Sequence, residues 1–261
     1  MARRVELNVD DGVARLRLVR ADAANAIDPE WVRALRAAVA DCAADRDVRA
    51  VLISAEGPAF TVGGDLRHFG ANLERLPEEL DEMVGTFHEA LAGLAELPAP
   101  VVCAVHGGAG GGGLGLLWCA DVVLAADDAK LATGFARIGL SGDGGGSWWL
   151  PRLVGMPRAR ELLIGGRVLS ATEAMDWGLV SRVVARDRLE PEALVVAREL
   201  AAGPTAAYGE MRRLLARSLS LELADGLAAE QEAMVRSGAT ADAREGIAAF
   251  VERRAPRFRG S

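Results

Sequence analysis

A single carboxylate stands in a glycine-rich loop near the middle of the chain. Residues 140–149 read LSGDGGGSWW, so Asp143 has four glycines around it and two of the five tryptophans after it. Glycine lets a chain turn tightly or approach a ligand closely. The aspartate therefore either makes the hydrogen bonds of an Asx turn or takes part in chemistry. In the second case, aromatic surroundings from Phe135, Trp148 or Trp149 would raise its pKa and suit it to move a proton.

A second glycine run could hold a negatively charged oxygen. It occupies residues 107–113, where six of seven residues are glycine, and follows the apolar stretch VVCAV. A helix through Trp118 is predicted directly after it. The first N–H groups of a helix have no partner within the helix, and the helix dipole adds positive potential there. The segment is therefore a candidate for stabilising an oxyanion.

Two other interpretations of this glycine run stay open. Gly108, Gly110 and Gly113 match the G-x-G-x-x-G pattern of a dinucleotide site, with Asp127 as the ribose-binding acid. A run this rich in glycine matches many patterns, however, and this one lies deep in the chain rather than at the start of a nucleotide-binding domain. Glycine also permits close packing of a helix on a sheet. A dinucleotide-dependent oxidoreductase is therefore retained as an alternative.

Composition and charge exclude several classes of function. The chain has 261 residues, of which 51% are hydrophobic and 26% charged, as expected of a globular protein with a sizeable core. A net charge of −7 argues against binding to nucleic acid or to a membrane surface. The cysteines lie apart within apolar runs, and neither a leader nor a membrane-spanning stretch is evident, so we expect a cytoplasmic protein with reduced thiols. His68, His88 and His106 are widely separated, and we expect neither a metal site nor a catalytic triad from them.

Helices are predicted from capping residues and from the spacing of apolar residues. Asp28 and Pro29 begin a helix as its cap and first residue. A long helix is expected to begin at Pro77 and to end before Pro98. Ser170 begins a further helix in a capping-box pattern with Glu173.

Strands alternate with these helices in the first part of the chain. A hairpin is predicted over residues 5–19, and further strands are expected at 48–54, 101–105 and 122–126. Strand–helix–strand alternation favours parallel pairing with helices packed on the sheet. We therefore predict an α/β core over residues 1–185, followed by a helical C-terminal part over residues 186–261.

At this point the sequence resembles the enoyl-CoA hydratase/isomerase (crotonase) superfamily. The segment AFTVGGDL at residues 59–66 is similar to the first oxyanion-hole segment of that family, and the glycine run is similar to the second. Further similar segments occur in the family's order along nearly the whole chain, at 20–26, 150–155, 174–180 and 245–258. The resemblance implies the crotonase (ClpP/crotonase-like) fold of stacked ββα units, and a homotrimer or dimer of trimers assembled through the helical C-terminal part. It also implies an acyl-CoA substrate, with coenzyme A as part of that substrate and no separate cofactor.

The resemblance assigns roles by position. The backbone N–H groups of Gly64 and Gly112 would hold the thioester oxygen. The other residues expected to line the substrate site are Ala26, Gly63, Asp65, Leu66, Arg67, Gly111, Phe135 and Trp148. Arg20 and Arg67 are candidates for the coenzyme A phosphates, although each could equally be a solvated surface arginine. Asp65 is expected to order its loop, and His106 to make a structural hydrogen bond.

The active-site acids distinguish reactions within the family. Members that add water use two glutamates, and at those positions this chain has Gly115 and Phe135. The isomerases, in particular the ring-1,2-epoxyphenylacetyl-CoA isomerase branch, have an acid that aligns with Asp143. We therefore expect double-bond isomerisation with Asp143 as the proton shuttle. The alternatives are a hydratase that uses Asp143 with an unidentified second acid, a dehalogenase with Asp143 as nucleophile, and a catalytically silent acyl-CoA-binding protein.

Overall fold

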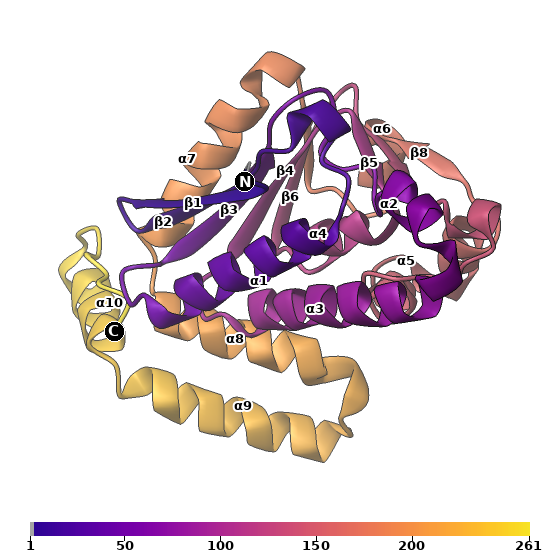
Figure 1. Cartoon of the computed structure of the whole chain (residues 1–261). Coiled ribbons are helices and arrows are strands. Elements are labelled where there is room, and N and C mark those ends of the chain that lie inside the picture. The colour runs from indigo at the N-terminus through magenta and orange to yellow at the C-terminus, as the bar shows by residue number, and fades with distance from the viewer. Residues whose placement is uncertain (1–2) are drawn as a thin grey trace.

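The computed structural model describes residues 3–261 and contains two β-sheets surrounded by helices (Figure 1). The larger sheet has six strands in the order β1-β2-β3-β4-β6-β9. Their bounds are β1 Val5–Asp10, β2 Val13–Leu18, β3 Ala50–Ala55, β4 Val101–Val105, β6 Val122–Ala126 and β9 Arg182–Val184. β1 and β2 form the predicted antiparallel hairpin, and β2, β3, β4, β6 and β9 pair in parallel, as the alternation of strands and helices predicted.

Helices cover both faces of this sheet. Residues 51 and 53 of β3 face a core that includes α1 (Pro29–Ala44) and α3 (Leu76–Glu96). Residues 50 and 52 face a second core formed with α7 (Leu189–Ala201). Successive side chains of a strand point to opposite faces, so the continuous apolar run of β3 serves both cores. α7 lies beyond the expected domain boundary at residue 185, yet it packs directly on the sheet of the first part.

Local chemistry fixes where the two long helices begin. The Asp28 carboxylate accepts a 2.7 Å hydrogen bond from the Trp31 amide and caps α1, while Pro29 occupies the first helical position, where no N–H is needed. α3 begins at Leu76, one residue before the expected Pro77, and ends before Pro98. The Ser170–Glu173 capping box is present at the start of α6 (Ala171–Asp176).

The smaller sheet was not predicted. It consists of three short strands, β5 (Gly108–Gly110), β7 (Lys130–Ala132) and β8 (Val168–Ser170), with β5 inside the glycine run. After β5 the chain forms a 3-10 helix (Gly111–Leu114) and then α4 (Gly115–Trp118), so the expected α-helix begins two residues after the end of the run. The segment at residues 59–61 makes a single bridge to this sheet, from Thr61 to Ala109.

Residues 186–261 are helical, as predicted, and the short strands β8 and β9 precede them. Two helices lie earlier in the chain. α5 (Gly146–Leu163) is kinked at Gly155, and α2 (Leu66–Ala71) is short. α8 (Thr205–Arg217) and α9 (Leu223–Gly238) form a lower layer beneath α3, and α10 (Ala241–Glu252) lies beside the far end of the hairpin (Figure 1).

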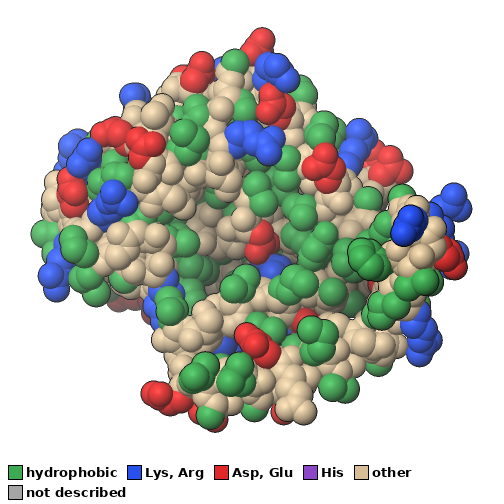
Figure 2. All heavy atoms as spheres, turned by 180° about the vertical axis from the view of Figure 1, so that it is seen from behind, with side chains coloured by type: hydrophobic (Ala, Val, Ile, Leu, Met, Phe, Trp, Pro, Cys, Tyr) green, Lys and Arg blue, Asp and Glu red, His purple; other side chains and the backbone are tan. Residues whose placement is uncertain are grey.

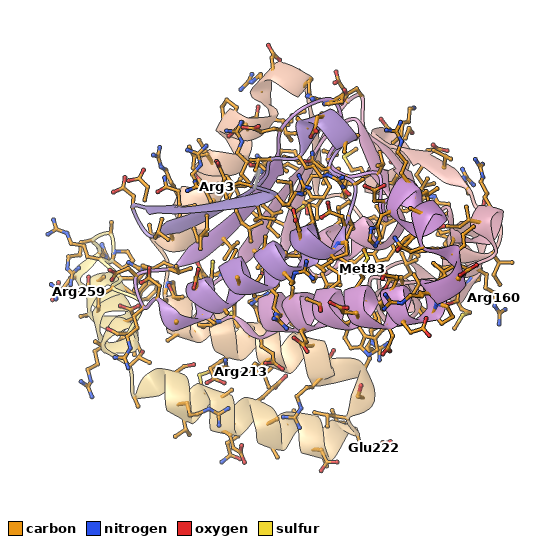
Figure 3. The ribbon with its side chains drawn as sticks, in the orientation of Figure 1. Arg3, Met83, Arg160, Arg213, Glu222 and Arg259 are labelled. Carbon is orange, nitrogen blue, oxygen red and sulfur yellow. The ribbon has the colours of Figure 1, made fainter. Side chains whose placement is uncertain are left out.

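Long-range polar contacts tie this layer to the sheet. The Arg49 guanidinium, next to the start of β3, donates to the Gly203 carbonyl at 2.6 Å and to the Phe258 carbonyl at 3.1 Å. The buried Asp242 carboxylate accepts from the amides of Arg259 and Gly260, each at 2.7 Å. Figure 3 shows Arg259 beside α10, with Arg213 and Glu222 on the lower layer. Within residues 3–261 no helix is both long and apolar enough to cross a membrane.

Candidate active site

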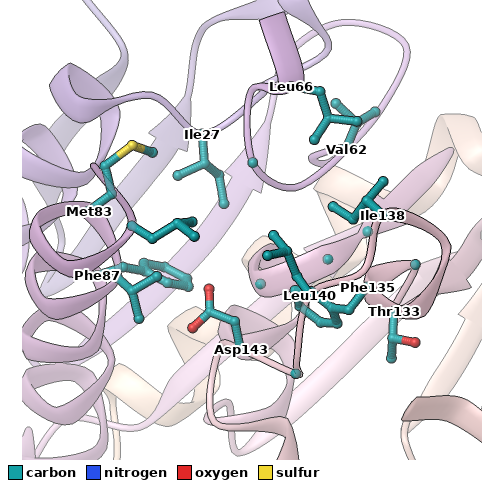
Figure 4. Close-up of a pocket in the computed structure, with 18 of the residues that line it drawn as sticks. Ile27, Val62, Leu66, Met83, Phe87, Thr133, Phe135, Ile138, Leu140 and Asp143 are labelled. Atoms are coloured by element: carbon teal, nitrogen blue, oxygen red, sulfur yellow. The ribbon is translucent and has the colours of Figure 1, made fainter. Parts of the chain in front are cut away.

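A cavity of about 850 Å³ lies between α3, the segment 61–66 and the loop 132–143. Figure 4 shows Met83 and Phe87 on the α3 side and Phe135 and Leu140 opposite, with the Asp143 carboxylate pointing into the space between them. Met83 is buried and lies near the centre of the molecule (Figure 3). The remaining large apolar residues of the lining are Ile27, Val32, Val62, Leu66, Phe69, Leu80, Val84 and Ile138. Such walls suit a largely apolar acyl group.

The two predicted oxyanion segments meet at this cavity. Gly63 has φ +85°, and a Cβ there would lie 3.0 Å from the Gly110 carbonyl oxygen and 3.1 Å from the Gly111 Cα. Conversely, a Cβ on Gly111 would lie 3.2 Å from the Gly63 Cα and 3.9 Å from the Gly64 nitrogen. Side chains at these positions would push the segments apart. Glycine is therefore required here by close backbone approach.

The expected donors are available in this arrangement. Ile27 holds the first segment, because its amide donates to the Gly63 carbonyl at 2.8 Å and its carbonyl accepts from the Asp65 amide at 2.9 Å. Gly64 lies between these bonds, and its own N–H has no acceptor among residues 3–261. Gly112 is in the first turn of its 3-10 helix, where amides have no partner within the helix, and likewise none is found in the described chain. Both glycines line the cavity.

Asp143 lies directly against the second donor segment. A Cβ on Gly112 would be 2.5 Å from Asp143 Oδ2, so this carboxylate oxygen faces the Gly112 backbone. The loop reaches this position because Gly144 and Gly145 have φ +61° and +72°. A Cβ on Gly144 would lie 2.2 Å from the Gly112 carbonyl oxygen, so only glycine fits. The Asp143 side chain is 23% exposed and lines the cavity, which places a base beside a candidate oxyanion donor.

The structure adds a residue that sequence analysis missed. His88 Nε2 lies 2.7 Å from Asp143 Oδ1, so the two carboxylate oxygens have different neighbours. His88 lies on α3, 55 residues before Asp143, and also lines the cavity. Sequence analysis considered His88 only for a metal site or a triad, and so did not anticipate this contact with Asp143. One signal was available, because His88 follows Val84 by four residues and so shares the apolar face of α3.

The absent hydratase glutamate is also excluded sterically at Gly115. A Cβ there would lie 2.6 Å from the Gly144 carbonyl oxygen and 2.8 Å from Leu91 Cδ1. This backbone therefore leaves no room for any side chain at position 115. Phe135, at the second glutamate position, is buried and lines the cavity.

Five residues that were expected to line the substrate site are not part of the cavity lining, namely Ala26, Gly63, Asp65, Arg67 and Trp148. Trp148 is 40% exposed, packs edge-on against Trp149, and has the Arg152 guanidinium 3.9 Å above its ring, so it is not part of the cavity wall. Of the three aromatic residues expected around Asp143, only Phe135 lines the cavity, and Phe87 lines it as well. Ala26 is buried behind the wall, and its neighbour Ile27 takes the lining position.

Arg20 and Asp65 form part of the scaffold. The Arg20 guanidinium contacts Asp65 Oδ2 at 2.8 Å and Asp28 Oδ2 at 3.2 Å, which leaves it committed to carboxylates rather than to phosphate. Asp65 also caps α2 by accepting from the amides of Arg67 and His68. Burial raises the pKa of Asp65, but hydrogen bonds from the His68 amide and from Arg20 outweigh it, and the pKa is lowered overall. Asp65 therefore orders its loop, as expected.

The remaining charged residues and histidines differ in their surroundings. Arg67 is exposed, and Lys130, the single lysine of the chain, is an exposed residue of the cavity rim that sequence analysis did not consider. His68 pairs with Glu79 at 2.9 Å outside the lining. His106 makes the expected structural contact, with Nε2 3.2 Å from the Gly57 carbonyl oxygen. No cluster of potential metal ligands occurs among residues 3–261.

Comparison with known proteins identifies the family. Residues 8–261 match the family model described as enoyl-CoA hydratase/isomerase. The 1,2-epoxyphenylacetyl-CoA isomerase of Escherichia coli K12 is 35% identical over 254 residues, 97% of each chain. A "probable enoyl-CoA hydratase" of Rhodobacter capsulatus is 36% identical over 259 residues, 98% of each chain. The crystal structure of an enoyl-CoA hydratase from Polaromonas sp. JS666 superposes with a TM-score of 0.93 at 33% identity, covering 98% of this chain and 99% of that one.

The chain therefore belongs to the enoyl-CoA hydratase/isomerase family and has the crotonase fold. This confirms the family and the fold predicted from the oxyanion segments. The relatives include both an isomerase and a "probable" hydratase by name, so the reaction has to be argued from the site.

Proposed function

We propose that this enzyme moves a carbon–carbon double bond within an acyl-CoA thioester. One observation supports this above all: a single carboxylate, Asp143, lies against a candidate oxyanion donor, Gly112, at a site without the hydratase glutamates. In addition to Asp143, the carboxylates of the lining comprise only Asp81, which is exposed, within the described part of the chain. Hydration with Asp81 as the second acid is the competing reaction.

The proposed reaction transfers one proton in two steps. Asp143 takes a proton from the carbon next to the thioester carbonyl, and the electron pair of that C–H bond moves into the carbonyl to give an enolate. The amides of Gly64 and Gly112 hold the enolate oxygen, and losing one such donor costs about 3 kcal/mol. Protonated Asp143 then returns a proton at the far end of the conjugated enolate. The double bond shifts, the carboxylate is restored, and no cofactor beyond the substrate's own coenzyme A is needed.

Replacing Asp143 by asparagine tests this proposal. Asparagine retains the size of the side chain and an oxygen that can face His88, but it cannot accept the substrate proton. We expect isomerisation and α-proton exchange to fall about a hundredfold or more, while acyl-CoA affinity, measured by calorimetry, changes little because the oxyanion donors are backbone groups. Unchanged exchange at matched acyl-CoA occupancy would refute the role of Asp143.

A comparison of rates separates isomerisation from hydration. Without a pair of glutamates, hydration of crotonyl-CoA should be slow beside double-bond migration in a 3-enoyl-CoA. Equal rates would favour the hydratase, and Asp81→Asn would then be expected to abolish hydration. Binding of acyl-CoA without any proton exchange would instead indicate a silent binding protein, and binding of NAD in place of acyl-CoA would indicate the oxidoreductase.

We also propose that the protein assembles as a homotrimer or a dimer of trimers and acts in the cytoplasm. Exposed apolar side chains on α9 and α10 support assembly, since single copies rarely leave so many uncovered. They are Leu223, Leu227, Met234, Val235, Ile247, Phe250 and Val251. Figure 2, which views the molecule from behind, shows apolar side chains on the surface of the lower layer. The three unpaired, buried thiols agree with a reducing compartment.

A further inference from the structure

The two carboxylate oxygens of Asp143 face different groups, one of which is His88. Oδ2 faces the Gly112 backbone, where the thioester is expected, and Oδ1 is 2.7 Å from His88 Nε2. The Asp143 side chain is 23% exposed, whereas that of His88 is 50% exposed. His88 Nδ1 has no hydrogen-bond partner in the chain from residue 3 onward. The imidazole therefore joins a shielded carboxylate to solvent.

We propose that His88 positions Asp143 and is the route by which Asp143 exchanges its proton with water. This inference rests on the proposed isomerisation. When an acyl group fills the cavity, its apolar walls exclude water from Oδ2, but the outer side of His88 remains wet. A carboxyl without such a partner would return to the product the same proton that it removed.

The relay conserves protons at each step. After Asp143 has taken the substrate proton, its carboxyl turns about the Cβ–Cγ bond, which has a broad torsional minimum, and presents the O–H to Nε2. In the tautomer that carries its N–H on Nδ1, the imidazole accepts this proton at Nε2, and the imidazolium then releases the Nδ1 proton to water. The reverse sequence brings a solvent proton to the carboxyl. The enolate can then be protonated either by the original proton or by one from solvent.

Deuterium partition tests this route without depending on overall rate. Isomerisation of a 3-enoyl-CoA is run in D₂O, and the deuterium content of the product is measured by mass spectrometry. His88→Gln keeps an N–H donor to Asp143 but cannot carry a proton. We expect exchange of the Asp143 proton to slow about a hundredfold, so the product should contain far less deuterium than that of the wild type. Turnover should fall less than deuterium content does.

The chain offers a matched control in His68. It pairs with Glu79 at 2.9 Å, much as His88 pairs with Asp143, but it does not line the cavity. His68→Gln should leave the deuterium content unchanged. Should His88→Gln fold poorly, His88→Ala assayed with added imidazole replaces it, and imidazole should restore deuterium uptake because the vacated position faces solvent.

The outcomes separate this inference from the proposed function. Equal deuterium content in His88→Gln and wild type, with isomerisation intact, would overturn the relay and leave Asp143 as the shuttle. A failure of imidazole to restore uptake in His88→Ala would also overturn it. A wild-type enzyme that neither isomerises nor exchanges would overturn the proposed function, and the relay with it.

Discussion

Adding one methyl group at Gly115 should displace the loop that contains Asp143. The new Cβ of Gly115→Ala would lie 2.6 Å from the Gly144 carbonyl oxygen, 3.1 Å from the Gly144 Cα and 2.8 Å from Leu91 Cδ1. Carbon atoms pack best at about 3.5–4.0 Å, so the Gly144 backbone must retreat by about 0.5–1 Å. Leu91 can change rotamer, but the carbonyl moves only with its loop. Asp143 directly precedes Gly144 in the chain, so it must move too.

The magnitudes follow from two opposing effects on the free energy of unfolding. Overpacking of a buried site costs about 1–3 kcal/mol. Alanine in place of a helical glycine returns about 1 kcal/mol, because Gly115 has helical dihedral angles. We expect a net loss of about 0–2 kcal/mol. Activity should fall further, since displacement of a reacting group by about 1 Å can cost a hundredfold.

Urea unfolding measures the loss of stability, and α-proton exchange measures the loss of activity, on the same samples. Gly226→Ala in α9 is the matched control, because no atom lies within 4 Å of its added Cβ. That variant should gain about 0.5–1 kcal/mol and keep its activity. A Gly115→Ala enzyme with the stability and exchange rate of the wild type would refute the packing argument. The same crowding predicts that Gly115→Glu cannot install the hydratase acid without moving the loop.

Two further predictions concern pH and assembly. Burial, and then Arg186, lower the pKa of His106 from 6.5, so the unfolded chain binds more protons below that pH, and stability should fall as the pH drops from about 7 to 5. His106→Asn keeps a donor for the Gly57 carbonyl and should flatten this dependence in urea titrations; an unchanged slope would contradict the assignment. Phe250 is 85% exposed on α10, and Phe250→Ser should weaken self-association in light scattering without loss of helical circular dichroism. Identical masses for variant and wild type at every concentration would place the interface elsewhere.

Sequence patterns were informative where a signal extends over several residues. The bounds of β4 and β6 match the expected strands at 101–105 and 122–126, because continuous apolar runs marked them. The strands β5, β7, β8 and β9 have three residues each, too few for an alternation to be visible. Their pairing is set by tertiary contacts rather than by local preference.

The site was predictable in its backbone parts and less so in its side-chain contacts. Close backbone approach requires glycine, so the segments containing Gly64 and Gly112 could be recognised in the sequence by their glycines. The contact between His88 and Asp143 depends on how α3 lies over the loop, which a lone histidine does not reveal. Trp148 was misplaced because α5 turns its third residue outward, where Arg152, one turn later, stacks on the ring.

The position of Arg49 has a consequence for the order of folding. Its guanidinium, beside the start of a central strand, bonds the carbonyls of Gly203 and Phe258, which are 154 and 209 residues away. While the chain is being synthesised, the contact with Phe258 can form only after residue 258 has left the ribosome. The Arg49 guanidinium therefore lacks its Phe258 partner until late in synthesis. Contacts of such separation slow folding, since loop closure precedes any gain from the contact. A ribosome that pauses before residue 258 would hold the chain in a state without this contact.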